Sequence, residues 1–169
     1  MVEPRVITVT PTHGIGVWHN VVITNVQGVM DAVSVRGIAD AYIRLLDAHP
    51  NGIAGITVLR ASLKVGSMDT NSEAQKAMAE LRSKLLHVSV VIENQGMLAQ
   101  LLRTVIRTLN SVARGTRLSI AANVDEAARA VVPHVVTPTA ESKAQLQREL
   151  RDAVETLRAK LPPVEANAS

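Results

Sequence analysis

Alternating or continuous runs of apolar residues predict the strands of this chain. The first covers residues 5–10, and the turn signal at residues 11–14 predicts a hairpin whose second arm runs from about residue 15 to 25. Within this arm, Gly16 and Asn20 indicate a bulge or a kink. Further strands are predicted over residues 53–60, 88–92 and 118–121.

Apolar side chains at spacings of three and four residues predict helices between these strands. The first helix follows Asp31, its expected N-cap, and ends at the turn signal of residues 49–52. Two overlapping capping boxes in residues 70–75 predict the start of the second. Further helices are predicted over residues 95–113, from the expected N-cap Asn123 to the stop at Pro133, and over residues 140–161. Strands and helices therefore alternate, which predicts an α/β fold with one mixed sheet and right-handed crossovers.

The last predicted helix carries an apolar seam of its own, with spacings close to those of a coiled coil. Its members are Leu146, Leu150, Val154, Leu157 and Leu161. Two interpretations are open: this helix packs back on its own domain, or it pairs with a second copy or another protein. We expect an α/β domain over residues 1–136, a helical extension over 137–161 and a disordered tail over 162–169.

Composition narrows the classes of function. The 169 residues include no Cys, which excludes a disulfide, a thiolate nucleophile and a Cys-based zinc site. Neither a basic leader followed by an apolar run nor a long uncharged apolar segment is found, so we expect a cytoplasmic protein with no transmembrane segment. The net charge of +3 comes from interspersed basic and acidic residues. This balance is compatible with peripheral contact with a membrane, whereas nucleic-acid binding is not expected.

The order of elements resembles the STAS fold of sulfate transporter tails and anti-sigma factor antagonists, in its diverged SpoIIAA-like branch. The residues that carry the resemblance are 21–23, 45–50, 88–93, 101–106 and 118–127. The resemblance implies a STAS-like mixed β-sheet with an N-terminal antiparallel hairpin and crossover helices. It also implies a regulatory, non-catalytic module whose partner is another protein.

Phosphorylated members of that family have an Asp-Ser-Ser-Gly turn in which the first Ser accepts phosphate. In this chain Asp69, Thr70, Asn71 and Ser72 stand in that place, and the family's Gly is missing. By the resemblance, Asp69, Thr70 and Ser72 form a candidate phospho-acceptor or partner loop. The competing interpretation is that Thr70 and Ser72 only cap the helix that follows.

The predicted helix of residues 95–113 has a basic face opposite its apolar stripe. Its members are Arg103, Arg107 and Arg114, with Arg117 just beyond. A phosphate, a lipid head group or an acidic protein surface would suit these guanidinium groups. A solvated helix face is the competing interpretation.

No catalytic or metal-binding motif is found in the sequence. The histidines lie far apart, without the spacing of a helical metal site, and the nucleophile elbow and the Gly-rich nucleotide motifs are absent. We therefore expect no metal, no cofactor and no enzymatic activity. The alternatives to a protein-binding module are a lipid or small-ligand carrier and a structural homo-oligomer built through the last helix.

Overall fold

The computed structural model describes residues 3–65, 76, 79, 84–93, 95, 96, 99, 100, 103, 104, 107, 117–137 and 141–163. Six strands form one mixed sheet in the order β1-β2-β3-β5-β7-β8. They are β1 (Arg5–Val9), β2 (His13–Trp18), β3 (Val21–Val26), β5 (Ile53–Leu59), β7 (Leu85–Ile92) and β8 (Arg117–Ala121). The first three are antiparallel neighbours, and β3, β5, β7 and β8 run parallel. This arrangement confirms the predicted α/β fold class.

The N-terminal part of the sheet has one more strand than the predicted hairpin. The expected second arm is divided between β2 and β3, because the chain reverses at His19 and Asn20. His19 has a φ of 51°, in the left-handed region that favours Gly. Asn20 is fully buried, and its amide nitrogen donates to the carbonyl oxygen of His134 (3.0 Å) while its Oδ1 accepts from the backbone N–H of Val136 (2.8 Å). The kink interpreted from Asn20 is therefore a complete turn.

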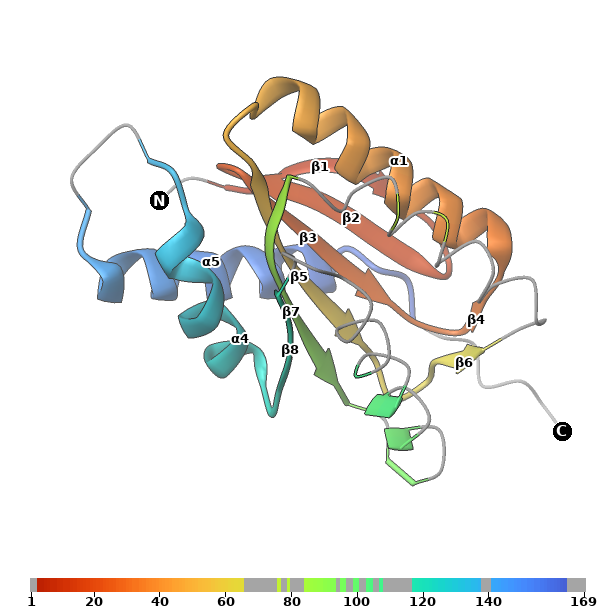
Figure 1. Cartoon of the computed structure of the whole chain (residues 1–169). Helices are drawn as coiled ribbons and strands as arrows, with labels where there is room; N and C mark the ends of the chain where they lie inside the picture. Colours follow the sequence, from red (N-terminus) through yellow and green to blue (C-terminus); the bar gives the residue numbers. More distant parts are fainter. Residues whose placement is uncertain are drawn as a thin grey trace, which may run out of the picture.

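Helix α1 (Ala32–Ala48) covers one face of the sheet (Figure 1). Asp31 caps it as predicted, because its Oδ1 accepts a hydrogen bond of 2.8 Å from the backbone N–H of Ser34. Tyr42 points from this helix toward β5, where a Cβ on Gly55 would lie 2.2 Å from the tyrosine hydroxyl oxygen. Burial raises the pKa of Tyr42 to about 12. Gly55 thus provides the space that this buried ring requires.

The opposite face of the sheet is covered by α4 (Val124–Val131), the 3₁₀ turn η1 (Val132–His134) and α5 (Lys143–Ala159) (Figure 1). Asn123 caps α4 as predicted, since its side-chain oxygen accepts from the backbone N–H of Glu126 at 2.9 Å. Helix α5 begins later than predicted, with Ser142 as its N-cap. None of the helices in the described part of the chain is long and apolar enough to cross a membrane.

The apolar seam of α5 lies in the core of the domain. Its five members, Leu146, Leu150, Val154, Leu157 and Leu161, are between 0% and 8% exposed. The last two leucines pack against β2, because a Cβ on Gly16 would be in van der Waals contact with Leu157 and one on Gly14 with Leu161, each at 3.4 Å. Packing on the same domain is therefore the arrangement adopted, and the interpretation as an exposed partner or oligomer seam is corrected. Residues 143–159 are part of the core because they cover one face of the sheet.

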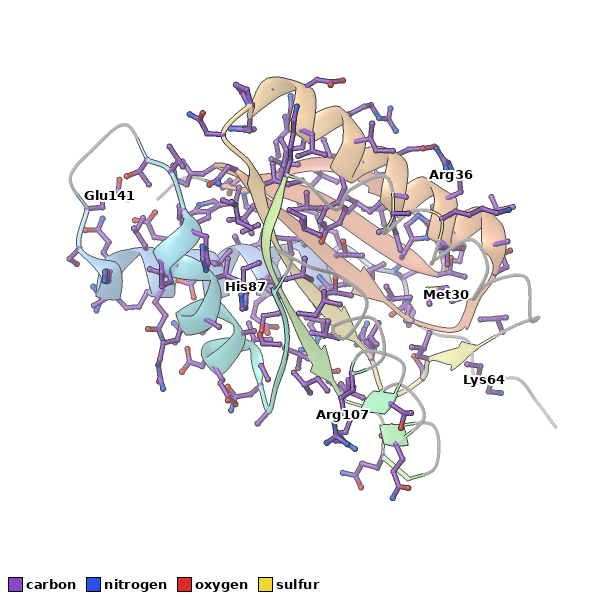
Figure 2. The ribbon with its side chains drawn as sticks, in the orientation of Figure 1. Met30, Arg36, Lys64, His87, Arg107 and Glu141 are labelled. Atoms are coloured by element: carbon purple, nitrogen blue, oxygen red, sulfur yellow. The ribbon has the colours of Figure 1, made fainter. Side chains whose placement is uncertain are left out.

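A small parallel sheet stands apart from the main one. It pairs β4 (Val29–Met30) with β6 (Lys64–Val65), and the backbone N–H of Lys64 donates to the carbonyl oxygen of Gly28 at 2.6 Å. Figure 2 labels Met30 and Lys64 at this place, beyond the end of β3. The small sheet therefore lies where β3 and β5 end.

Candidate functional site

Polar residues meet at the carboxyl edge of the sheet, the edge at which the parallel strands end. Val26, Leu59 and Ile92 are the last residues of their strands and neighbours in register. The residues that follow them are Gln27, Arg60 and Glu93. The antiparallel β2 begins at the same edge, where His13 pairs with Val26. The register therefore brings together side chains that are far apart in the sequence.

Gln27 is the fully buried centre of this edge. Its Nε2 donates to the carbonyl oxygens of Pro11 (3.1 Å) and Pro162 (2.7 Å). Its Oε1 accepts a short hydrogen bond from the guanidinium of Arg60. One amide thus joins the β1–β2 turn, the end of β5 and the chain that follows α5.

An open hollow of about 660 Å³ adjoins these residues, and we call it the arginine hollow. Its lining consists of Arg60, Ala61, Ser62, Glu93, Arg158, Ala159, Leu161, Pro162 and Pro163. The guanidinium of Arg158 donates from one nitrogen to both carboxylate oxygens of Glu93 at 2.6 Å. Both side chains of this ion pair are about one quarter exposed. The arginine hollow is therefore open to the solvent.

A cluster of hydroxyl groups surrounds His13 at the same edge. The Nδ1 atom of His13 lies 3.1 Å from Oγ1 of Thr10 and 3.2 Å from Oγ1 of Thr12. Thr12 also contacts the hydroxyl of Ser34 at 3.3 Å. Burial lowers the pKa of His13, and the nearby carboxylate of Asp31 partly opposes this effect. Thr10 also bonds to the backbone of His13 and Thr12, so the cluster stabilises the β1–β2 turn.

A second polar cluster lies on the α4 side of the sheet, where Figure 2 labels His87. Nε2 of His87 is 2.9 Å from the hydroxyl of Ser119, which donates to the hydroxyl of Ser89 at 3.1 Å. The ring of His134 stacks on His87 with centroids 5.2 Å apart. Sequence spacing could not reveal this pair, because β7 and η1 supply one histidine each. Among the described residues, no three His, Asp or Glu side chains gather as a metal site would require.

Several of the predicted site residues lie outside the described residues. These are Asp69, Thr70, Ser72 and Arg114. Arg103 is half-buried and Arg107 is exposed, and both have helical backbone. Arg117 is the first residue of β8, opposite His87 of β7. The predicted basic group therefore includes a residue of the sheet as well as residues of helical segments.

Sequence reasoning did not single out Gln27, Arg60, Glu93 or Arg158. The available signal was a polar residue at or shortly after the end of each of three predicted strands. That signal is weak, because strands commonly end in polar residues, and it does not include Arg158 of α5. Only the packing of α5 brings this arginine to the carboxyl edge.

Comparison with known proteins supports the fold and leaves the function open. No protein-family model matches the chain, and no curated protein matches it either. The structure is similar to the crystal structure of an uncharacterized protein from the DUF3478 family with a SpoIIAA-like fold, from Shewanella loihica PV-4. The TM-score is 0.50 at 14% identity, over 75% of this chain and 95% of that chain. The resemblance inferred from the order of elements is thus confirmed at the level of fold: this chain has a SpoIIAA-like fold.

Proposed function

We propose that this chain is a non-catalytic regulatory module that recognises a partner protein at the carboxyl edge of its sheet. A pair of large apolar side chains in water carries the proposal. Val29 of β4 is 51% exposed, and Val33 in the first turn of α1 is 79% exposed. They stand on either side of the N-cap Asp31. Apolar side chains that gather on a surface commonly mark sites of protein interaction.

The small sheet of β4 and β6 borders this surface, and in the sequence β6 comes shortly before the predicted partner residues. Val29 pairs with Lys64, so β6 lies directly beside the exposed valine. Element β6 is the last one described before residues 66–75, which include Asp69, Thr70 and Ser72. We therefore propose that this loop and the two valines contribute to one partner surface.

We propose a non-catalytic role because the polar side chains at the carboxyl edge hold parts of the fold together. The threonine hydroxyls beside His13 hold the β1–β2 turn, and the amide of Gln27 bonds to two backbone carbonyls and to the guanidinium of Arg60. We expect the purified protein to show no turnover of generic phosphatase, esterase and nucleotidase substrates. Turnover that follows the protein peak through successive purification steps would contradict this role.

Partner capture with one substitution and one matched control tests the surface. Val33→Asp should abolish capture of the partner from an extract of the source cell, while the acidic side chain suits the positive end of α1 and preserves folding. Val136→Asp is the control, because Val136 is 57% exposed and its backbone lies at the amino edge beside Asn20. Equal capture by both variants would refute the proposed surface.

A further inference from the structure

The arginine hollow has properties that the proposed partner surface does not use. We propose that it binds a small organic monoanion in which a carboxylate is attached to an apolar body. The volume of about 660 Å³ lies within the range of roughly 300–1,000 Å³ that is typical of small-molecule sites. This inference does not depend on the proposed protein-binding function.

The guanidinium of Arg60 is held in place before any ligand arrives. The Oε1 atom of Gln27 accepts its hydrogen bond, and Gln27 is itself fully buried and fixed by Pro11 and Pro162. A positioned side chain loses little conformational freedom on binding. The planar fork of an arginine also matches a carboxylate geometrically. Arg60 is therefore the group that we expect to receive the anion.

The charges in the lining favour a single negative charge on the ligand. Arg158 is paired with Glu93, to which it donates at 2.6 Å, and with the half-exposed Glu155 outside the lining, to which it donates at 3.4 Å. Among the residues that the structure describes, the other positive charge in the lining, that of Arg60, has no carboxylate partner. A carboxylate balances this charge. A phosphate monoester, with a charge of about −1.5 to −2, would add excess negative charge beside Glu93.

The rest of the lining favours an apolar body behind the carboxylate. Apart from Ser62 and the charged groups, the lining residues are Ala61, Ala159, Leu161, Pro162 and Pro163. Apolar ligand surface removed from water against these side chains adds affinity in proportion to its area. Acetate would satisfy Arg60 but would leave most of the hollow unfilled.

Calorimetric titration with three probes tests both parts of the ligand. Octanoate carries the charge and the apolar chain, octanol lacks the charge, and acetate lacks the chain. We expect octanoate to bind the full-length protein, with octanol and acetate weaker by about tenfold or more, because each loses one contribution. Equal binding of octanol, equal binding of acetate, or no binding of octanoate would each overturn the inference.

Two arginine variants then locate the site. Arg60→Gln should weaken octanoate binding by about tenfold or more, since a hydrogen bond to a charged group is lost. Arg44→Gln is the matched control, because Arg44 lines a separate hollow between β1 and α1 together with Arg5 and apolar residues. Equal loss in both variants, or no loss in Arg60→Gln, would refute the site.

A third variant guards against an effect of Arg60→Gln on folding. Ala159 lies exposed at the end of α5 and lines the hollow without a part in the Gln27–Arg60 hydrogen bond. Ala159→Trp should fill the hollow and abolish octanoate binding while the melting temperature is retained. Unchanged octanoate binding by Ala159→Trp would overturn the inference. Val33→Asp should bind octanoate normally, which separates this inference from the proposed partner surface.

Discussion

Helix α5 supplies buried apolar surface that we expect the domain to need. Its seam of Leu146, Leu150, Val154, Leu157 and Leu161 is at most 8% exposed. At about 1.5–3 kcal/mol for each fully buried side chain, the seam contributes about 8–15 kcal/mol. The whole free energy of unfolding of a domain is about 5–15 kcal/mol. Truncation after Pro138 should therefore abolish cooperative unfolding.

Point variants measure the same contribution in the full-length chain. Leu150 is completely buried, and Leu150→Ala should lower the free energy of unfolding by about 2–5 kcal/mol. Arg148 is exposed on the same helix, and Arg148→Ala should change it by no more than about 0.5 kcal/mol. Urea denaturation followed by circular dichroism gives both values.

Light scattering and thermal melting of the truncated chain provide the decisive comparison. A smaller oligomeric mass together with a retained cooperative melt would mean that α5 serves association and that the domain folds without it. The same conclusion would follow if Leu150→Ala were as stable as Arg148→Ala. Either result would refute the assignment of α5 to the core.

Four further substitutions test particular contacts. In Gly55→Ala the new methyl group would lie 2.2 Å from the hydroxyl oxygen of Tyr42, and overpacking of this kind costs about 1–3 kcal/mol. Tyr42→Phe removes that oxygen. Urea denaturation should therefore show a smaller loss of the free energy of unfolding in the double variant than the sum of the losses in the two single variants. Additive losses would contradict the contact. Asn20→Ala leaves the carbonyl oxygen of His134 and the backbone N–H of Val136 without their partner and should cost about 1–3 kcal/mol, whereas an unchanged melting temperature would argue against this role. Burial lowers the pKa of His13 from 6.5, so the unfolded chain takes up the proton first as the pH falls. Stability should therefore decline below about pH 6.5 and level off below the folded-state pKa. His13→Gln should reduce this slope, and identical slopes would show that His13 is not the group responsible.

The positions of most elements could be predicted because their signals are local. Asp31 and Asn123 were expected as N-caps, and each accepts a hydrogen bond from the backbone N–H three residues later. Such a bond needs only the first turn of a helix, so a short stretch of sequence contains it. Apolar periodicity likewise determined which segments are strands and which are helices. The order of these segments was sufficient to indicate the SpoIIAA-like fold.

The turn between β2 and β3 shows where local signals are insufficient. His19 adopts a φ of 51° without the Gly that normally indicates such a turn. What holds the turn is Asn20, whose hydrogen-bond partners His134 and Val136 come from the chain after α4. The sequence around residue 20 contains neither partner. A bulge and a full reversal were therefore indistinguishable from the sequence.

The choice between a buried and an exposed α5 seam also depended on the tertiary structure. An apolar seam with coiled-coil spacing has the same sequence whether it covers its own sheet or pairs with a second copy. Leu161 lies against Gly14 and Leu157 against Gly16 of β2, and these contacts appear only once the two segments are packed together.

The sequence by itself determined most of the elements and their order, because these follow from short-range periodicity and capping. Only the tertiary structure determined which residues form the arginine hollow. Gln27 and Arg60 are 33 residues apart, and Glu93 and Arg158 are 65 apart. Strand register brings Gln27, Arg60 and Glu93 to one edge of the sheet. Because the apolar face of α5 packs on the sheet, Arg158 lies beside them. The physical reason is that contacts between distant residues depend on how whole elements pack, and no local pattern in the chain encodes that packing.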